Sequence, residues 1–239
     1  MQLLRSLLFT AYMMLSAACW GTVMGLCFFL STRTQFRLAR AWARSVLWLL
    51  KVLCGLSYTV EGLQRIPPGN HVVMSNHTSS WETVAMFVLF PAQAWVLKRE
   101  LLWIPCVGWG IARLKPISIN RGAGHRAVNQ VIEQGRQRLA DGLWVAIFPE
   151  GTRVVAGEHR KYGISGALLA TETGKMVVPL AHNAGEFWVR RGIVKHPGVV
   201  RVIVGEPISS VGKEPRVLNG EVRASIDASL ARLAVPSPA

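Results

Sequence analysis

A histidine and a carboxylate lie five residues apart in the segment 76–82 (Asn-His-Thr-Ser-Ser-Trp-Glu), where an extended apolar run gives way to a helical pattern. A neutral imidazole can take a proton from a hydroxyl near neutral pH when a carboxylate fixes its tautomer and stabilises the imidazolium. On one continuous α-helix, His77 and Glu82 would lie about 140° apart. We therefore expect His77 just before the helix and Glu82 in its first turn, with the hydroxyl residues between them as N-caps.

Glu82 also has a purely structural interpretation. The residues from Ser79 to Glu82 fit the S-x-x-E capping box, in which the glutamate accepts a hydrogen bond from a backbone amide at the start of a helix. From these residues alone, both interpretations stand.

A second group of polar residues follows the apolar strand pattern at 144–148. In an open α/β sheet, ligands bind at the carboxyl ends of the strands, which is where Glu150, Gly151, Thr152 and Arg153 would lie. Gly151 would allow a close approach of the backbone, and the guanidinium of Arg153 suits phosphate oxygens. A strand-exit turn with a surface Glu–Arg pair is the alternative.

Basic residues follow two further strand patterns. Arg121 comes after 117–119, and Lys98 comes after 94–97. Together with Arg153 they could form one anion pocket, although each alone is typical of a solvated charge. Between them, Leu101–Ile111 reads as an apolar loop with two tryptophans, which is either buried or placed at a membrane interface.

Short apolar runs alternate with helical patterns from residue 71 onward. We predict strands at 71–75, 94–97, 117–119, 144–148, 176–180 and 200–204, and helices at 80–90, 123–140, 164–173 and 218–233. Such alternation is typical of α/β folds. We expect a single α/β domain whose mostly parallel, mixed sheet is flanked by helices.

The first part of the chain reads as a membrane-associated helical segment. Residues 6–32 carry no charge, and the apolar run is long enough to span or deeply enter a bilayer. A cleaved signal peptide fits less well, because the run is too long and no A-x-A site follows it. We divide the chain into N-terminal membrane-anchoring helices at 1–62 and an α/β domain at 63–239.

A basic amphipathic helix is predicted at 33–56. Its cations fall on one side: Arg33, Arg37, Arg40, Arg44 and Lys51. Such a helix beside an apolar one is typical of a membrane-surface element that prefers anionic lipid, and an ordinary surface helix is the alternative. The excess of basic residues after the apolar run places the rest of the chain on the cytoplasmic side of the inner membrane.

The net charge of +14 has nucleic-acid binding as another possible meaning. The sequence has no dense basic tract and no RNA-binding motif, so we expect lipid headgroups or phosphorylated substrates instead of nucleic acid. The four cysteines are scattered without a C-x-x-C pair, and no histidine pair has zinc-ligand spacing, so we expect no metal.

Four motifs occur in the order found in the glycerolipid acyltransferases. They are His77-x-x-x-x-Glu82, the Arg121 segment, Phe148-Pro149-Glu150-Gly151-Thr152-Arg153 and Val178-Pro179-Leu180. Over about residues 70–208 the chain resembles the 1-acyl-glycerol-3-phosphate (lysophosphatidic acid) acyltransferase family. Two positions depart from the family pattern: Glu82 stands where Asp is usual, and Leu180 where Val or Ile is usual.

The resemblance implies acyl transfer from acyl-CoA or acyl carrier protein to the sn-2 hydroxyl of lysophosphatidic acid, without a covalent enzyme intermediate or a cofactor. It implies His77 as general base, oriented by Glu82. Arg121, Glu150, Gly151, Thr152 and Arg153 would bind the glycerol phosphate, with Lys98 as a helper, and Val178 and Pro179 would belong to the acyl-donor pocket. Membrane phospholipid and lysophospholipid are the implied partners.

Two other hypotheses remain open from the sequence. One keeps the chemistry and changes the acceptor, to glycerol 3-phosphate, another lysophospholipid or an acylated amino-acid lipid. The other is a non-catalytic basic protein that binds membranes or nucleic acid, which would leave the 148–153 motif unexplained. A serine hydrolase is disfavoured, because the sequence around Ser165 lacks the G-x-S-x-G spacing.

Overall fold

The strands of the described part of the chain form one seven-stranded mixed sheet. The computed structural model describes residues 1–155, 157–158 and 160–234, with the side chain of Arg121 excepted. The strand order is β1-β7-β6-β2-β5-β3-β4. The strands are β1 (Leu56–Glu61), β2 (Val72–Ser75), β3 (Gln93–Lys98), β4 (Ile117–Ile119), β5 (Trp144–Ile147), β6 (Val177–His182) and β7 (Gly198–Val204). Every neighbouring pair is parallel except β6 and β7, so the predicted mostly parallel, mixed sheet is confirmed.

Strand β2 lies in the middle of the sheet, between β5 and β6. In register, Val72 lies beside Val145 of β5 and Val177 of β6. All three strands are buried along their whole length, as expected for parallel strands covered on both faces. Because the three run in the same direction, the residues that follow them meet at one edge of the sheet.

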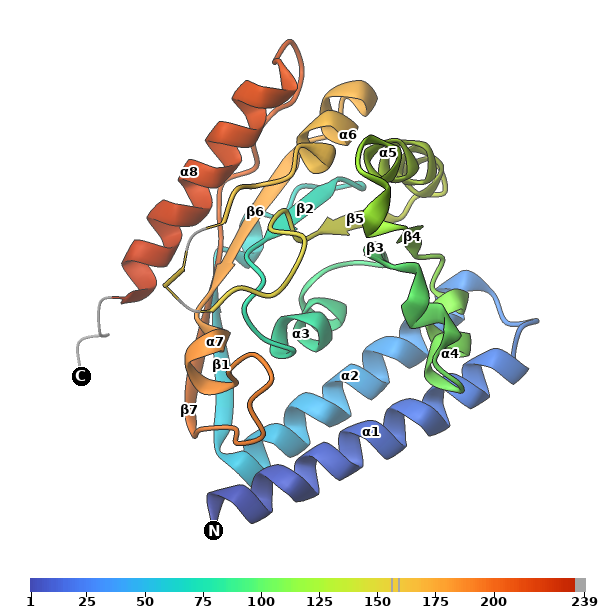
Figure 1. Ribbon diagram of the computed structural model, residues 1–239, viewed down its shortest axis with the longest axis vertical. Helices are drawn as coiled ribbons and strands as arrows, with labels where there is room; N and C mark the ends of the chain where they lie inside the picture. Colours follow the sequence, from blue (N-terminus) through green and yellow to red (C-terminus); the bar gives the residue numbers. More distant parts are fainter. Residues whose placement is uncertain (156, 159, 235–239) are drawn as a thin grey trace.

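Helices cover both faces of the sheet (Figure 1). One face carries α5 (His125–Ala140), α6 (Ser165–Thr173) and α8 (Pro215–Ala234). The other carries α3 (Trp81–Leu89), with α2 (Thr32–Cys54) and α1 (Gln2–Leu26) layered beyond it. The short elements are η1 (Leu63–Arg65), η2 (Arg99–Trp103), α4 (Val107–Arg113), η3 (Arg121–Ala123) and α7 (Ala184–Phe187).

The first strand was not predicted from the sequence. We expected residues 1–62 to be helical, but α2 ends at Cys54, where Gly55 adopts the left-handed conformation, and the chain then forms β1. Along its length β1 pairs with β7, from Leu56 beside Gly198 to Glu61 beside Ile203. The sheet therefore begins within the segment that we had assigned to the N-terminal helices.

Helix α1 packs closely on α4, which forms part of the predicted apolar loop. Gly21 and Gly110 permit this contact, because a Cβ atom added to Gly110 would lie 2.6 Å from the Gly21 Cα. Trp103 and Trp109 stay more than half exposed beside this contact. The apolar segment at 101–111 is therefore partly covered by α1, while its tryptophans remain at the surface.

Helix α2 carries the predicted basic stripe, and one of its cations has a structural partner. The side chain of Arg40 donates hydrogen bonds to the carbonyl oxygens of Phe87 and Phe90, at 3.0 and 2.6 Å. These carbonyls lie at the end of α3, where no helical amide is available to them. The side chain of Arg40 thus links α2 by hydrogen bonds to α3, the helix that carries Glu82.

Candidate active site

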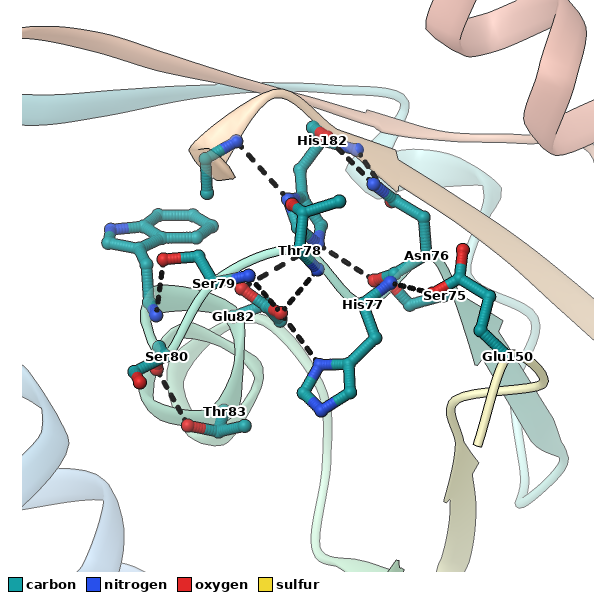
Figure 2. A network of polar contacts seen from close by, with 12 residues as sticks. Ser75, Asn76, His77, Thr78, Ser79, Ser80, Glu82, Thr83, Glu150 and His182 are labelled. Atoms are coloured by element: carbon teal, nitrogen blue, oxygen red, sulfur yellow. Dashed lines mark hydrogen bonds and ion pairs between the residues drawn. The ribbon is translucent and has the colours of Figure 1, made fainter. Parts of the chain in front are cut away.

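His77 lies between the end of β2 and the start of α3, and its ring reaches back to Glu82. The Nδ1 atom donates a hydrogen bond to Oε1 of Glu82 at 2.8 Å, and only 8% of His77 is exposed (Figure 2). Helix α3 begins at Trp81, so Glu82 lies in its first turn. The relative placement expected from the sequence is therefore confirmed.

Glu82 also satisfies the backbone at the start of α3. Its Oε1 atom accepts hydrogen bonds from the amides of Thr78 and Ser79, at 3.0 and 2.9 Å. The second of these bonds is the one that a capping box requires of its glutamate. The two interpretations of Glu82 are thus compatible, because one oxygen serves both the helix start and the histidine.

The electrostatics of this pair favour an ionised carboxylate. Burial alone would raise the pKa of Glu82, but His182, the hydrogen bond from His77 and the amide of Ser79 together lower it below its ordinary value. A carboxylate at this point requires the proton of neutral His77 to sit on Nδ1. The Nε2 atom then keeps its lone pair, as a general base needs.

Residues of the segment after β5 contact both the ring and the backbone of His77. The ring of Phe148 stacks on the imidazole, with centroids 4.0 Å apart and planes 11° apart. The backbone of His77 donates to Oε2 of Glu150 at 2.7 Å, and its carbonyl oxygen accepts from the amide of Val154 at 2.8 Å. The second motif group therefore holds the histidine from one side.

Glu150 is a half-buried carboxylic acid whose side chain accepts the hydrogen bond from the His77 amide. Burial raises its pKa to about 7, against the opposing effect of the hydrogen bond from the His77 amide. Gly151 follows with φ of +70°, a left-handed conformation that favours glycine. The space where its Cβ would lie is open, so this glycine provides a turn and no close backbone contact.

An apolar cavity of about 300 Å³ opens beside His77, Phe148 and Arg153. Trp20 of α1 and Trp42 of α2 line it together with residues from the globular part of the chain. The Nε atom of Arg153 is buried and has no hydrogen-bond partner among the described residues. The cavity thus combines an imidazole, an apolar wall and one guanidinium that can bind an anionic ligand.

The other predicted site residues lie elsewhere. Lys98 is exposed and forms an ion pair with Glu100 at 3.8 Å, while Thr152 is half-buried in the turn after Gly151. Val178 and Pro179 are buried inside β6, and neither lines the cavity beside His77. Arg121 begins η3, but its side chain lies outside what the structure describes.

Sequence reasoning missed three residues that contact the pair. Phe148 was part of a motif but had no role, although it stacks on His77. Asn76 and His182 are hydrogen-bonded to each other behind Glu82 (Figure 2). A polar residue at the end of a buried strand is the signal that could have found His182.

Among the described residues, no group of three His, Cys, Asp or Glu side chains is placed to hold a metal ion.

Comparison with known proteins shows similarity to acyltransferases. A family model described as Acyltransferase matches residues 57–183. The 1-acyl-sn-glycerol-3-phosphate acyltransferase of Pseudomonas aeruginosa is 39% identical over 240 residues, covering 97% of this chain and 92% of that protein. The enzyme of the same name from Borreliella burgdorferi is 27% identical over 184 residues, covering 76% of this chain and 71% of that protein.

The fold also matches a solved structure. The crystal structure of the 1-acyl-sn-glycerophosphate acyltransferase from Thermotoga maritima superposes with a TM-score of 0.82 at 22% identity, covering all of this chain and 98% of that one. At this level of identity the likeness concerns the fold alone.

Proposed function

The chain belongs to the 1-acyl-sn-glycerol-3-phosphate acyltransferase family of glycerolipid acyltransferases, and on this basis we propose that it transfers an acyl chain from a thioester to the sn-2 hydroxyl of lysophosphatidic acid. The product is phosphatidic acid, a precursor in phospholipid biosynthesis. The observation that carries the proposal is the His77–Glu82 pair, which borders an apolar cavity also lined by Arg153.

In the proposed reaction His77 acts as general base. Its Nε2 atom removes the proton of the acceptor hydroxyl, while Glu82 stabilises the imidazolium through Nδ1. The hydroxyl oxygen forms a bond to the thioester carbonyl carbon, and the carbon–sulfur bond breaks as the tetrahedral intermediate collapses. The imidazolium returns its proton to the leaving thiolate, so the enzyme ends in its starting state.

The cavity and Arg153 suit the two ends of an amphiphilic substrate. Apolar side chains line most of the cavity, as an acyl chain requires. The guanidinium of Arg153 also lines a second, smaller cavity together with Arg160 and Arg190. Arg153 therefore supports binding of the phosphate at the boundary between an apolar and a basic region, with Arg121 as a further candidate.

The described residues favour an enzyme held in one leaflet. Helix α1 is long and apolar enough to cross a membrane by length and composition. Gln2, Ser6 and Thr10, spaced four residues apart, all bond to buried Lys195, and the other end of α1 packs on α4. Because both ends are tied to the globular part, α1 lies along the protein and presents its exposed leucines to lipid. The basic residues of α2 support the cytoplasmic face.

An acyl-transfer assay with purified protein tests the proposal. Labelled acyl-CoA and acyl carrier protein thioester are each offered with a panel of lysophospholipids and with glycerol 3-phosphate, beside His77→Ala. We expect label in phosphatidic acid with the wild type alone. Transfer to another acceptor would keep the mechanism and replace the substrate. Failure with every donor and acceptor would refute the proposed function.

A further inference from the structure

His182 is a fully buried histidine behind the catalytic pair. It ends β6 and is 1% exposed, so neither substrate can reach its ring. Figure 2 shows it on the side of Glu82 away from the free edge of His77. Burial lowers the pKa of its imidazole below the ordinary value, against the opposing effect of the Glu82 carboxylate. Its function must therefore lie in its contacts.

The hydrogen bonds of His182 determine which nitrogen carries the proton. Its Nδ1 atom accepts from the amide of Ala184 at 3.3 Å, so Nδ1 carries no hydrogen. The Nε2 atom must then be the donor, and it points to the carbonyl oxygen of Asn76 at 3.0 Å. The ring thus presents a fixed N–H dipole toward the loop that carries His77.

Two further bonds tie the same loop to His182. The backbone amide of His182 donates to Oδ1 of Asn76 at 3.1 Å, and Nδ2 of Asn76 donates to the His182 carbonyl oxygen at 2.9 Å. Asn76 directly precedes His77, so these bonds set where the catalytic loop leaves the sheet.

The second oxygen of Glu82 faces His182. Oε1 already accepts three hydrogen bonds, whereas Oε2 is buried and has no hydrogen-bond partner among the described residues. The Nε2 atom of His182 lies 3.9 Å from Oε2. An aspartate at this position would be shorter by one carbon–carbon bond of about 1.5 Å, and its carboxylate could not keep both the His77 and the His182 distances.

We propose that His182 is a positioning residue for the acyl-transfer reaction: its Nε2–H, which is donated to the Asn76 carbonyl oxygen, also lies 3.9 Å from Oε2 of Glu82 and attracts that oxygen electrostatically, so that Oε1 stays on Nδ1 of His77. The proposal rests on the proposed function, because it presumes that His77 is the base. It also gives the glutamate in the first motif a partner that an aspartate would not reach.

Two substitutions test the contributions of the two ring nitrogens of His182 separately. His182→Gln keeps an N–H donor at the position of Nε2, whereas His182→Asn keeps polar atoms only at the position of Nδ1. We expect His182→Gln to stay within about fivefold of the wild-type kcat. His182→Asn should lose tenfold or more in kcat with little change in KM, because the ground-state contacts of the substrate are untouched.

His71 provides a matched control at the opposite end of β2. Its Nδ1 accepts from the amide of Met176 at 3.2 Å, and its Nε2 lies 3.0 Å from the carbonyl oxygen of Pro68. His71→Asn therefore keeps the polar position of Nδ1 and removes the Nε2 contact to a backbone carbonyl oxygen, as His182→Asn does, without touching Glu82. It should leave kcat near the wild-type value, and thermal unfolding of every variant shows whether the fold is kept.

The same substitution in a Glu82→Asp background tests the contact itself. If His182 acts through Oε2, then His182→Asn should lower kcat by less than about threefold in the Glu82→Asp background, where the carboxylate lies farther from His182. Such a result would be non-additive.

Should His182→Asn fail to fold, His182→Phe takes its place, since it keeps a ring and removes both nitrogens. Equal losses for the Gln and Asn variants, or an equal loss in both backgrounds, would refute the positioning role. A wild-type protein without acyl transfer would refute the proposed function instead.

Discussion

Oε1 of Glu82 is shared between Nδ1 of His77, at 2.8 Å, and the backbone amides of Thr78 and Ser79, which directly precede the start of α3. The start of α3 and the His77–Glu82 pair therefore depend on one carboxylate oxygen. The two amide hydrogen bonds fix the position of Oε1, and this oxygen in turn fixes the orientation of the His77 ring. Glu82, for which the sequence left both interpretations open, thus serves the start of α3 and orients the imidazole of His77.

Removing the imidazole of His77 should lower turnover steeply and leave the fold intact. His77→Ala removes the proton acceptor, so kcat should fall on the order of a hundredfold to ten-thousandfold. The protein should remain bound to vesicles, because α1 and α2 do not depend on the imidazole. Acyl transfer is measured with labelled thioester, and sedimentation with anionic vesicles serves as the control. Activity near the wild-type level would remove His77 from the mechanism.

Arg153 should affect substrate binding more than chemistry. Arg153→Ala removes a guanidinium that lines the cavity beside His77, so KM for the phosphorylated acceptor should rise on the order of tenfold to a hundredfold. Arg153→Lys keeps the charge and loses the planar fork, so we expect an intermediate KM. Unchanged KM and kcat in the alanine variant would place the phosphate elsewhere.

Glu150 should make stability depend on pH. Its folded pKa of about 7 lies above the ordinary value of 4.5, so the native state binds the proton more tightly than the unfolded state does. The contribution of Glu150 to the free energy of unfolding should be fully present below pH 4.5. It should be lost as the pH rises to about 7, which lowers the free energy of unfolding by on the order of 3 kcal/mol. Glu150→Gln should flatten this dependence in denaturant titrations at pH 5 and pH 8. A wild-type protein equally stable at both values would contradict the assignment.

Ala17 of α1 lines the apolar cavity. A larger side chain at this position should therefore limit the cavity to shorter acyl chains. Ala17→Leu should lower kcat/KM for long-chain donors by roughly tenfold relative to short-chain donors, because the added carbons occupy substrate space. Ala11→Leu is the matched control, since Ala11 is exposed on the same helix. A parallel loss for all chain lengths would indicate damage to the fold in place of a changed cavity.

Membrane binding should depend on the exposed leucines of α1. Leu8 and Leu15 are 54% and 72% exposed and lie seven residues apart on one face. Leu8→Glu together with Leu15→Glu should weaken vesicle binding by tenfold or more, since each buries apolar area in lipid. Val211, which is 74% exposed between β7 and α8, offers the control Val211→Glu. Equal binding of both variants would mean that lipid contacts another surface.

The sequence by itself determined the parts of this protein that depend on local pattern. Alternating apolar periods predicted the α/β sheet and most of its elements, because side-chain burial in a helix or strand follows its own repeat. Likewise, the hydroxyl residues before Trp81 placed the start of α3, which brought His77 and Glu82 together. β1 was missed because its six residues directly follow α2, with only Gly55 between the two elements.

Only the tertiary structure decided what surrounds the His77–Glu82 pair. Glu150 lies 73 residues from His77, and His182 lies 106 residues from Asn76, yet both are bonded to this loop. These contacts exist because β2 lies between β5 and β6, an order that chain position does not reveal. The same holds for the cavity, whose wall includes Trp20 and Trp42 from helices that precede the sheet. Spacing along the chain predicts which residues can do chemistry, whereas strand order decides which of them meet.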